Sequence, residues 1–323
     1  MKKIIVTVLA IVAVFCLSAF AFTACGETEK GVYDIFAPDG APVLALADMW
    51  GEDTENAELN YGVIGESEVN TKMKSGEADF IAAPINIGAS IHAAYKSGGT
   101  PYDYKLLNVT SWGVIYFTTN EDRYKTREEC ASAAEFLSQF DGKTMSTIGL
   151  AAIPGKTVQY LFGEAEASVT LNGSDATVIQ QSYVKGDATT AIFAEPAITG
   201  VRTKAGEDSV KVLASVSDIY KEITGKDFPM SGLFVRSDVL ENDPDAVKAV
   251  DERVKSSVEK FNSNIDEVSA KAESIEGFSL KAAVIKKAYD KMNVAYKNSD
   301  DSKGDVETLL AKIGAPCDDD LFA

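Results

Sequence analysis

Residues 144–163, with the sequence TMSTIGLAAIPGKTVQYLFG, constrain the fold more than any other stretch of the chain. Residues 144–148 alternate in polarity as a short strand does, residues 149–154 are small and turn-forming, and residues 155–162 place apolar side chains on one helical face. Gly163 follows where a helix C-cap is expected. A strand, a turn and a helix start direct free N–H groups and a positive helix end to one point. The stretch predicts an α/β fold with a seat for an anion or polar group.

The same turn is close to a phosphate-binding loop but does not match one. The pattern G-x-x-x-x-G-K-[ST], aligned on Gly155, requires a glycine where this chain has Leu150. The glycine that is present, Gly149, lies one position away. A nucleotide-hydrolysing loop is therefore disfavoured, and both a structural turn and a non-catalytic ligand contact stay open.

The amino terminus has the features of an export signal. Lys2 and Lys3 precede an uncharged run that ends at Cys25. The FTAC sequence ending at Cys25 resembles a bacterial lipobox, so we expect residues 1–24 to be a signal peptide. Cys25 would then carry lipid, and residues 25–30 would form a tether. An uncleaved anchor is the alternative, because the run is long enough to cross a bilayer. Both alternatives place the remaining chain outside the cytoplasmic membrane.

The composition limits the partners and cofactors. The chain has 49 acidic and 31 basic residues, a net charge of −18, which argues against nucleic acid as a partner. Cys130 and Cys317 match no metal-site spacing and are expected to be free, buried thiols. The acidic run 318–320 lacks the spaced loop of a calcium site and is expected to be solvated. We expect no metal and no cofactor.

Strands and helices alternate through much of the chain. Strands are expected at 32–37, 59–64 and 79–83, with helices from Pro42, over 67–74 and up to Lys96, which indicates a mostly parallel sheet covered on both faces. Segments 74–84 and 185–196 share one order, in which a helix end, a glycine, an acid, a short strand and a proline follow one another. This order predicts two lobes of similar topology.

Two extended segments, 106–119 and 228–236, are candidates for the connections between these lobes. They divide the chain into lobe I, residues 31–116 and 229–323, and lobe II, residues 117–228. Beyond Arg236 the chain is expected to be helical, with Asp243 and Pro244 starting one helix and further helices over 279–292 and 305–313.

Ligands of open α/β sheets lie outside the carboxyl ends of strands, so two facing lobes would form a cleft between them. The residues expected to line it follow strand ends or lie at the crossing: Asp39, Gly40, Ala41, Pro84, Asn86, Ser111, Trp112, Gly155, Lys156, Thr157 and Glu195. Lys156 and the backbone near Gly155 would donate hydrogen bonds, Glu195 would accept them, and Trp112 would cover an apolar group. Alternatively, Lys156 is solvated, Glu195 only caps its helix, and Trp112 belongs to the interlobe core.

Taken in order, the segments FTAC, APDGAP, GEADFIAAP, IPGKT, GDATTAIFAEP and LFVRSDVLENDPDAV resemble those of the extracytoplasmic solute-binding proteins of ABC importers. The similarity covers most of the mature chain and lies in the nitrate, sulfonate, taurine and thiamine-precursor branch. It implies an α/β fold of the two-lobed type II periplasmic-binding class, with mixed sheets covered by helices and a ligand cleft between the lobes. The resemblance further implies a monomer that binds a small solute, either a sulfonate or taurine-like anion or a thiamine-pyrimidine-like compound, and docks on ABC permease subunits. Ala194 stands where this branch often has an aromatic residue, which leaves the solute undecided.

Two other classes of function were weighed. An enzyme is disfavoured, because the lone histidine, His92, lies on an alanine-rich helical stretch and no nucleophile or metal motif is found. A Ser–His pair that meets only in the folded chain is not excluded by sequence. A sensory or scaffolding lipoprotein on the same fold is the second alternative.

Overall fold

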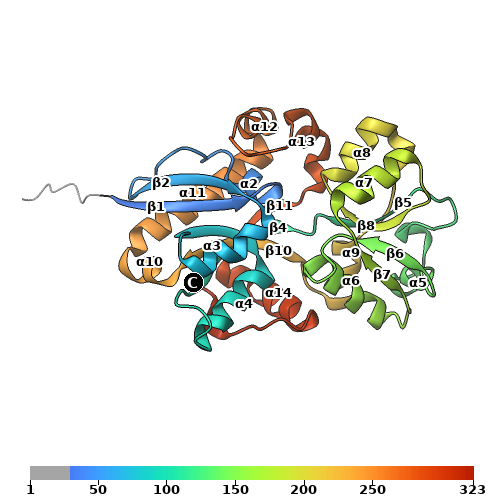
Figure 1. The fold of residues 1–323 in the computed structure, drawn as a ribbon, viewed down its shortest axis with the longest axis horizontal. Helices are drawn as coiled ribbons and strands as arrows, with labels where there is room; N and C mark the ends of the chain where they lie inside the picture. The colour runs from blue at the N-terminus through green and yellow to red at the C-terminus, as the bar shows by residue number, and fades with distance from the viewer. Residues whose placement is uncertain (1–29) are drawn as a thin grey trace, which may run out of the picture. The chain divides into compact units, whose positions relative to one another are not determined.

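The computed structural model describes residues 30–323, which form two β-sheets covered by helices (Figure 1). This confirms the predicted fold class. The expected signal peptide and the lipidation site at Cys25 lie outside the described residues. Among the helices that are described, none is both long enough and apolar enough to span a bilayer.

The first sheet has six strands in the order β11-β4-β10-β3-β1-β2. Its strands are β1 (Gly31–Pro38), β2 (Ala57–Ile64), β3 (Phe80–Pro84), β4 (Tyr104–Trp112), β10 (Pro229–Arg236) and β11 (Val294–Asn298). The helices connected with it are α2 (Ala41–Leu46), α3 (Val69–Ser75), α4 (Ile85–Lys96), α10 (Ser237–Asn242), α11 (Pro244–Ser263), α12 (Ile265–Glu273), α13 (Ala282–Ala288) and α14 (Ser299–Lys312).

The second sheet has five strands in the order β7-β6-β8-β5-β9. Its strands are β5 (Ile115–Thr119), β6 (Thr144–Thr147), β7 (Thr170–Gly173), β8 (Thr190–Ala194) and β9 (Lys211–Ser215). Its helices are α5 (Ala133–Ser138), α6 (Ile153–Glu164), α7 (Ala176–Lys185), α8 (Ala197–Ala205) and α9 (Val216–Thr224).

The two sheets share one topology, as the internal similarity predicted. β1 pairs in parallel with β3, and β3 pairs antiparallel with β10. In the second sheet β6 pairs in parallel with β8, and β8 pairs antiparallel with β5. Gly76 and Gly186 end the equivalent helices α3 and α7 at φ 71° and 77°. This is the left-handed backbone region that glycine adopts without a steric penalty.

The chain passes between the sheets at Gly113. Residues 106–119 were expected to be an extended connection between the lobes, and they do connect the two sheets, because β4 belongs to the first sheet and β5 to the second. Gly113 has φ 61°, and a Cβ atom there would lie 2.5 Å from Cβ of Ser217. A residue with a side chain is therefore disfavoured at this crossing on two grounds. β10 carries the chain back into the first sheet, and the limits of the two lobes stay a prediction.

A continuous apolar cluster joins the two sheets. Its buried members include Ile85 on α4, Trp112 and Ile115 on either side of the crossing, and Ile153 on α6. A second cluster lies between the first sheet and α11, and a third lies under α7 and α8 in the second. Burial of apolar surface is the main favourable term in folding, so both sheets and their junction contribute to stability.

Several local expectations were wrong. α6 extends to Glu164, so Gly163 lies inside the helix and Ala165 is the C-cap. The helix expected over 279–292 is shorter, because α13 ends at Ala288 and a 3₁₀ turn follows. The edge strand β11 was not predicted at all. Cys130 is a buried free thiol as expected, but the free thiol of Cys317 is exposed.

Candidate functional site

The loop after β1 holds the first group of candidate residues. Gly40 has φ 115° and is the N-cap of α2, and Ala41 is the first residue of that helix. Asp39 is exposed, and its Oδ1 accepts a hydrogen bond from the backbone N–H of Ser279 at 3.0 Å. In this conformation one oxygen of Asp39 therefore ties the loop to the segment before α13.

The segment after β3 holds the second group. Pro84 ends β3 and is the N-cap of α4. Asn86, in the first turn of α4, is half-buried, and its Oδ1 is fully buried with no hydrogen-bond partner among the described residues. Pro84 is the register partner of Ser231 on β10, which places this helix start beside the crossing strands.

The turn after β6 differs from the simple anion seat that its sequence predicts. The N–H of Gly155 donates to the carbonyl of Gly149 at 3.1 Å, and the N–H of Lys156 donates to that of Ala152 at 3.1 Å. Both amides are therefore already paired within the turn and helix. Gly155 serves packing instead, because a Cβ atom there would lie 2.3 Å from the carbonyl oxygen of Leu150.

Two polar side chains in the first turns of α6 have no polar partner among the described residues. Lys156 is half-buried and its ammonium group has no hydrogen bond or ion pair with another described residue. Thr157 is fully buried, and its hydroxyl also has no partner in the described part of the chain. A helical threonine normally can bond the carbonyl one turn earlier, so a free hydroxyl here is notable.

Glu195 follows β8 and is 3% exposed. Its Oε2 accepts from the N–H of Thr199 in the first turn of α8 at 3.0 Å, so the capping alternative is correct for this oxygen. Its Oε1 is buried and unpartnered, and no ion pair to Glu195 exists within residues 30–323. The pKa of Tyr116 is raised, first by burial and second by the negative charge of Glu195. Capping therefore accounts for only half of this carboxylate.

Ser111 and Trp112 end β4 and are both buried. The indole N–H of Trp112 donates to the carbonyl of Ala295 at 2.8 Å, and Nζ of Lys297 lies 4.4 Å from the ring centre. Trp112 also belongs to the cluster that joins the sheets, as the interlobe-core alternative expected. It lines a cavity of about 330 Å³ together with residues that include Phe228, Tyr296 and Lys297.

Contacts at the crossing connect the two helix starts that carry Asn86 and Glu195. Ser231, paired with Pro84, follows Met230, whose sulfur lies 3.4 Å from the N–H of Val114. The carbonyl of Val114 in turn accepts from the N–H of Glu195 at 3.0 Å. The strand ends before α4 and α8 are thus linked through a few residues, although they belong to different sheets.

Four buried side-chain atoms in the described part of the chain have no hydrogen-bond partner. They are Oδ1 of Asn86, Oγ1 of Thr157, Oε1 of Glu195 and the hydroxyl of Tyr220. Each such atom costs about 1–3 kcal/mol unless a water or ligand pairs it. Three of the four belong to residues that the sequence predicted as ligand contacts, and these three follow strands of both sheets.

Solved structures share this architecture over almost the whole chain. The structure of an ABC transporter from Parabacteroides distasonis aligns with a TM-score of 0.69 and 16% identity, covering 90% of this chain and 98% of its own. The zinc-bound ligand-binding component of an ABC-type import system from Staphylococcus aureus aligns at 0.63 and 14%, covering 91% and 96%. The periplasmic aliphatic sulphonate-binding protein SsuA from Escherichia coli aligns at 0.62 and 12%, covering 88% and 85%.

This chain has the periplasmic-binding-protein fold. At these identities the similarity establishes the fold and leaves the solute open. No family model matches the chain. No curated protein matches it either.

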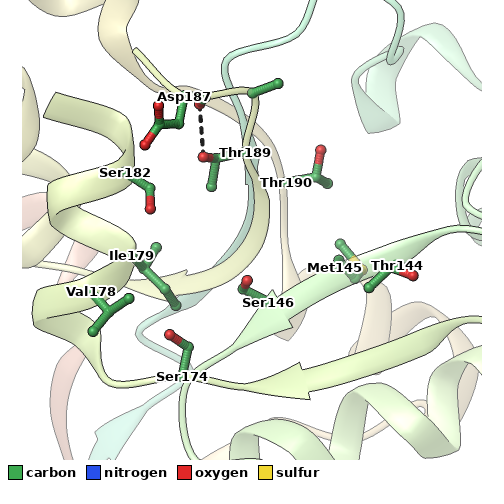
Figure 2. Close-up of a pocket in the computed structure, with 11 residues that line it drawn as sticks. Thr144, Met145, Ser146, Ser174, Val178, Ile179, Ser182, Asp187, Thr189 and Thr190 are labelled. Atoms are coloured by element: carbon green, nitrogen blue, oxygen red, sulfur yellow. Dashed lines mark hydrogen bonds between the residues drawn. The ribbon is translucent and has the colours of Figure 1, made fainter. Parts of the chain in front are cut away.

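The chain has a second cavity, which the sequence did not predict, beside the second sheet. It has a volume of about 230 Å³ and is lined by β6, α7 and the start of β8. Figure 2 shows Ser146, Ser174 and Ser182 around this hollow, while the hydroxyl of Thr189 donates to the carbonyl of Asp187 at 2.8 Å. None of the residues predicted to bind ligand lines this cavity.

The lone histidine and the acidic run 318–320 meet beside α4, a helix of the first sheet. His92 is 1% exposed, with Nδ1 2.7 Å from Asp103 and Nε2 3.2 Å from Oδ1 of Asp320. Asp320 also pairs with Lys96 at 2.8 Å, and the pKa of Asp320 is held well below its usual range, chiefly by this hydrogen bond. The run is therefore not simply solvated, because Asp320 fastens it to α4.

One group of described side chains has the spacing of a metal site. The nearest ligand atoms of His92, Asp318 and Asp320 lie within 4.8 Å of one another. The ammonium group of Lys96 already pairs with both acids, at 3.6 Å and 2.8 Å, and supplies the positive charge that a cation would bring. The geometry therefore fits an ion-pair network that anchors the chain end.

Proposed function

We propose that this protein is the extracytoplasmic substrate-binding component of an ABC importer. It captures a small solute between its two lobes and delivers it to the permease subunits, as a monomer held at the membrane by lipidated Cys25. The observation that carries the proposal is the set of unpartnered buried atoms of Asn86, Thr157 and Glu195. The fold supports it, because the similar structures include ligand-binding components of import systems.

The arrangement suits reversible capture. Asn86 follows a strand of the first sheet, whereas Thr157 and Glu195 follow strands of the second. A solute that pairs with groups from both lobes gains its full set of contacts only when the lobes are closed. Because a ligand shifts a conformational equilibrium only by its differential affinity for the two states, this solute would favour the closed form. The permease would then recognise that form.

The two solute classes implied by the resemblance remain candidates at this point. The unpaired ammonium of Lys156 favours a sulfonate or taurine-like anion. The carboxylate of Glu195 favours a thiamine-pyrimidine-like compound, whose amino group is a hydrogen-bond donor. Chemical transformation of the solute is not part of the proposal, and binding alone accounts for the unpartnered atoms.

A thermal-shift screen tests this function. A ligand that binds only the folded protein raises its melting temperature, by mass action. Sulfonates, taurine, thiamine precursors and amino acids form the panel, and we expect one class to raise the melting temperature in a concentration-dependent way. Absence of a shift with every class, at millimolar concentrations, would contradict the proposal.

A further inference from the structure

The carboxylate of Glu195 sets the strongest chemical demand in the site. It is 3% exposed, one of its oxygens is unpaired, and no described lysine, arginine or histidine forms an ion pair with it. Glutamates are almost never fully buried without a partner, because removing the charge from water is costly. The N–H from α8 satisfies only Oε2. In the ionised carboxylate Oε1 can only accept a hydrogen bond, so its natural partner is an N–H group, preferably a charged one.

The other unpartnered atoms have compatible chemistry. Oδ1 of Asn86 is an acceptor and calls for a donor as well, while the hydroxyl of Thr157 can donate or accept. The unpartnered atoms are therefore two acceptors, on Glu195 and Asn86, and one hydroxyl, on Thr157, that can either donate or accept. An oxyanion such as a sulfonate has only acceptor oxygens, so it would leave Oε1 of Glu195 unpaired and would be repelled by the carboxylate, whereas the amide NH₂ group of Asn86 could donate to either kind of solute.

The positive charge of Lys156 favours an anionic solute, and the burial of its side chain decides how strong this preference is. Its side chain is half-buried, whereas Glu195 is almost completely buried. A partly exposed ammonium on a flexible stem can remain hydrated, so it does not need a counter-charge from the solute. The buried carboxylate has no such alternative. The requirement of Glu195 therefore outweighs the preference of Lys156.

From these contacts we infer that the solute carries a cationic or N–H-rich nitrogen group, such as an amine, amidine or aminopyrimidine, that donates to Glu195 and Asn86. This inference rests on the proposed function and narrows it to one chemical class. It sets this chain apart from the sulphonate-binding structures that share its fold.

Glu195→Gln tests the inference by reversing one atom's role. The glutamine can keep an oxygen toward the N–H of Thr199, which places its NH₂ group where Oε1 was. A donor-bearing solute then loses an acceptor and meets a competing donor, whereas an oxyanion gains a partner. Calorimetry measures the binding of two sets of probes. Ethanesulfonate and butanesulfonate carry no N–H donor. Putrescine, agmatine and 4-amino-5-hydroxymethyl-2-methylpyrimidine carry N–H donors.

We expect wild-type protein to bind at least one N–H probe and neither sulfonate. Glu195→Gln should weaken that binding by about 10- to 100-fold, the range for a hydrogen bond to a charged group. Asn86→Asp, which replaces the amide by a second acceptor-only group in the other lobe, should keep or strengthen it. The melting temperature of ligand-free Glu195→Gln, compared with that of the wild type and of Asn86→Asp, separates a binding effect from a folding defect at the α8 cap.

Three outcomes would overturn the inference. The first is binding of a sulfonate by the wild type with no N–H probe bound, and the second is tighter sulfonate binding in Glu195→Gln. The third is binding of an N–H probe that Glu195→Gln leaves unchanged. All three leave solute capture intact, so they contradict the solute class alone. Failure of every probe and of the wider solute screen would instead contradict the proposed function, and with it this inference.

Discussion

Two glycines of α6, Gly155 and Gly163, should respond to alanine in opposite directions. A Cβ atom at position 155 would lie 2.3 Å from the carbonyl oxygen of Leu150 and 2.4 Å from its Cα atom. Ordinary contacts are 3.4–4 Å, so the turn before α6 must move by about 1 Å. At position 163 no atom lies within 4 Å of the added Cβ, and the site is an exposed helical position.

The expected changes in the free energy of unfolding follow from these distances. Forcing an extra methyl group into a packed site costs about 1–3 kcal/mol, and replacing a helical glycine by alanine gains about 0.5–1 kcal/mol. Gly155→Ala should therefore lower the free energy of unfolding by about 1–2 kcal/mol. Gly163→Ala, with the gain and no clash, should raise it by up to about 1 kcal/mol.

Urea denaturation followed by circular dichroism measures both variants against the wild type. Because Lys156 and Thr157 follow the displaced turn, Gly155→Ala should also weaken solute binding, while Gly163→Ala should leave it unchanged. Equal stability of the two variants, or a Gly155→Ala protein as stable as the wild type, would refute the packing role assigned to Gly155.

Three further predictions concern single side chains. Lys156→Ala should leave the melting temperature of the free protein within a few degrees of the wild type and change solute affinity, which calorimetry measures; unchanged affinity removes Lys156 from the site. The pKa of Tyr33 is raised from 10.0 to about 12, first by burial and then by its hydrogen bond to Asp243, so the stability it contributes is complete below pH 10 and is lost as the pH rises toward 12. Tyr33→Phe should therefore show a flatter decline of unfolding free energy across this alkaline window, and identical declines would contradict the assignment. The lowered pKa of Asp320 means that its contribution is complete above about pH 4 and is lost only in stronger acid, as the carboxylate is protonated in the folded state and its pairing with Lys96 ends. Asp320→Asn should cost no more than about 1 kcal/mol at neutral pH, because the pair is partly exposed, and the difference from wild type in urea titrations should vanish in strong acid.

The fold could be predicted from local patterns because both halves repeat one β-α-β order with clear punctuation. Gly76 and Gly186 end helices in the left-handed region, and prolines begin the helices that follow. β11 was missed, since a short strand with mixed polarity has no distinctive periodicity and is fixed only by pairing with β4. The helix end at Ala165 was missed because Gly163 needs no left-handed conformation there.

The candidate site could be predicted only in part. Asn86, Thr157 and Glu195 were predicted as ligand contacts because they follow strand ends, where open sheets bind ligands. The structure adds that each has a buried atom without a partner among the described residues, and ligand contact itself stays a prediction. The paired amides of Gly155 and Lys156 could not be foreseen, because they depend on how the preceding turn closes on Gly149 and Ala152. The position of Asp320 beside His92 depends on contacts between distant parts of the chain, which no local pattern records.

Native mass spectrometry on the protein with the tightest-binding solute from the screen tests the central claim most directly. The account predicts one solute molecule bound per protein monomer, with the solute recovered after release at an unchanged mass. A solute recovered in altered chemical form, or a protein that retains no small molecule from any class, would contradict capture between the two lobes.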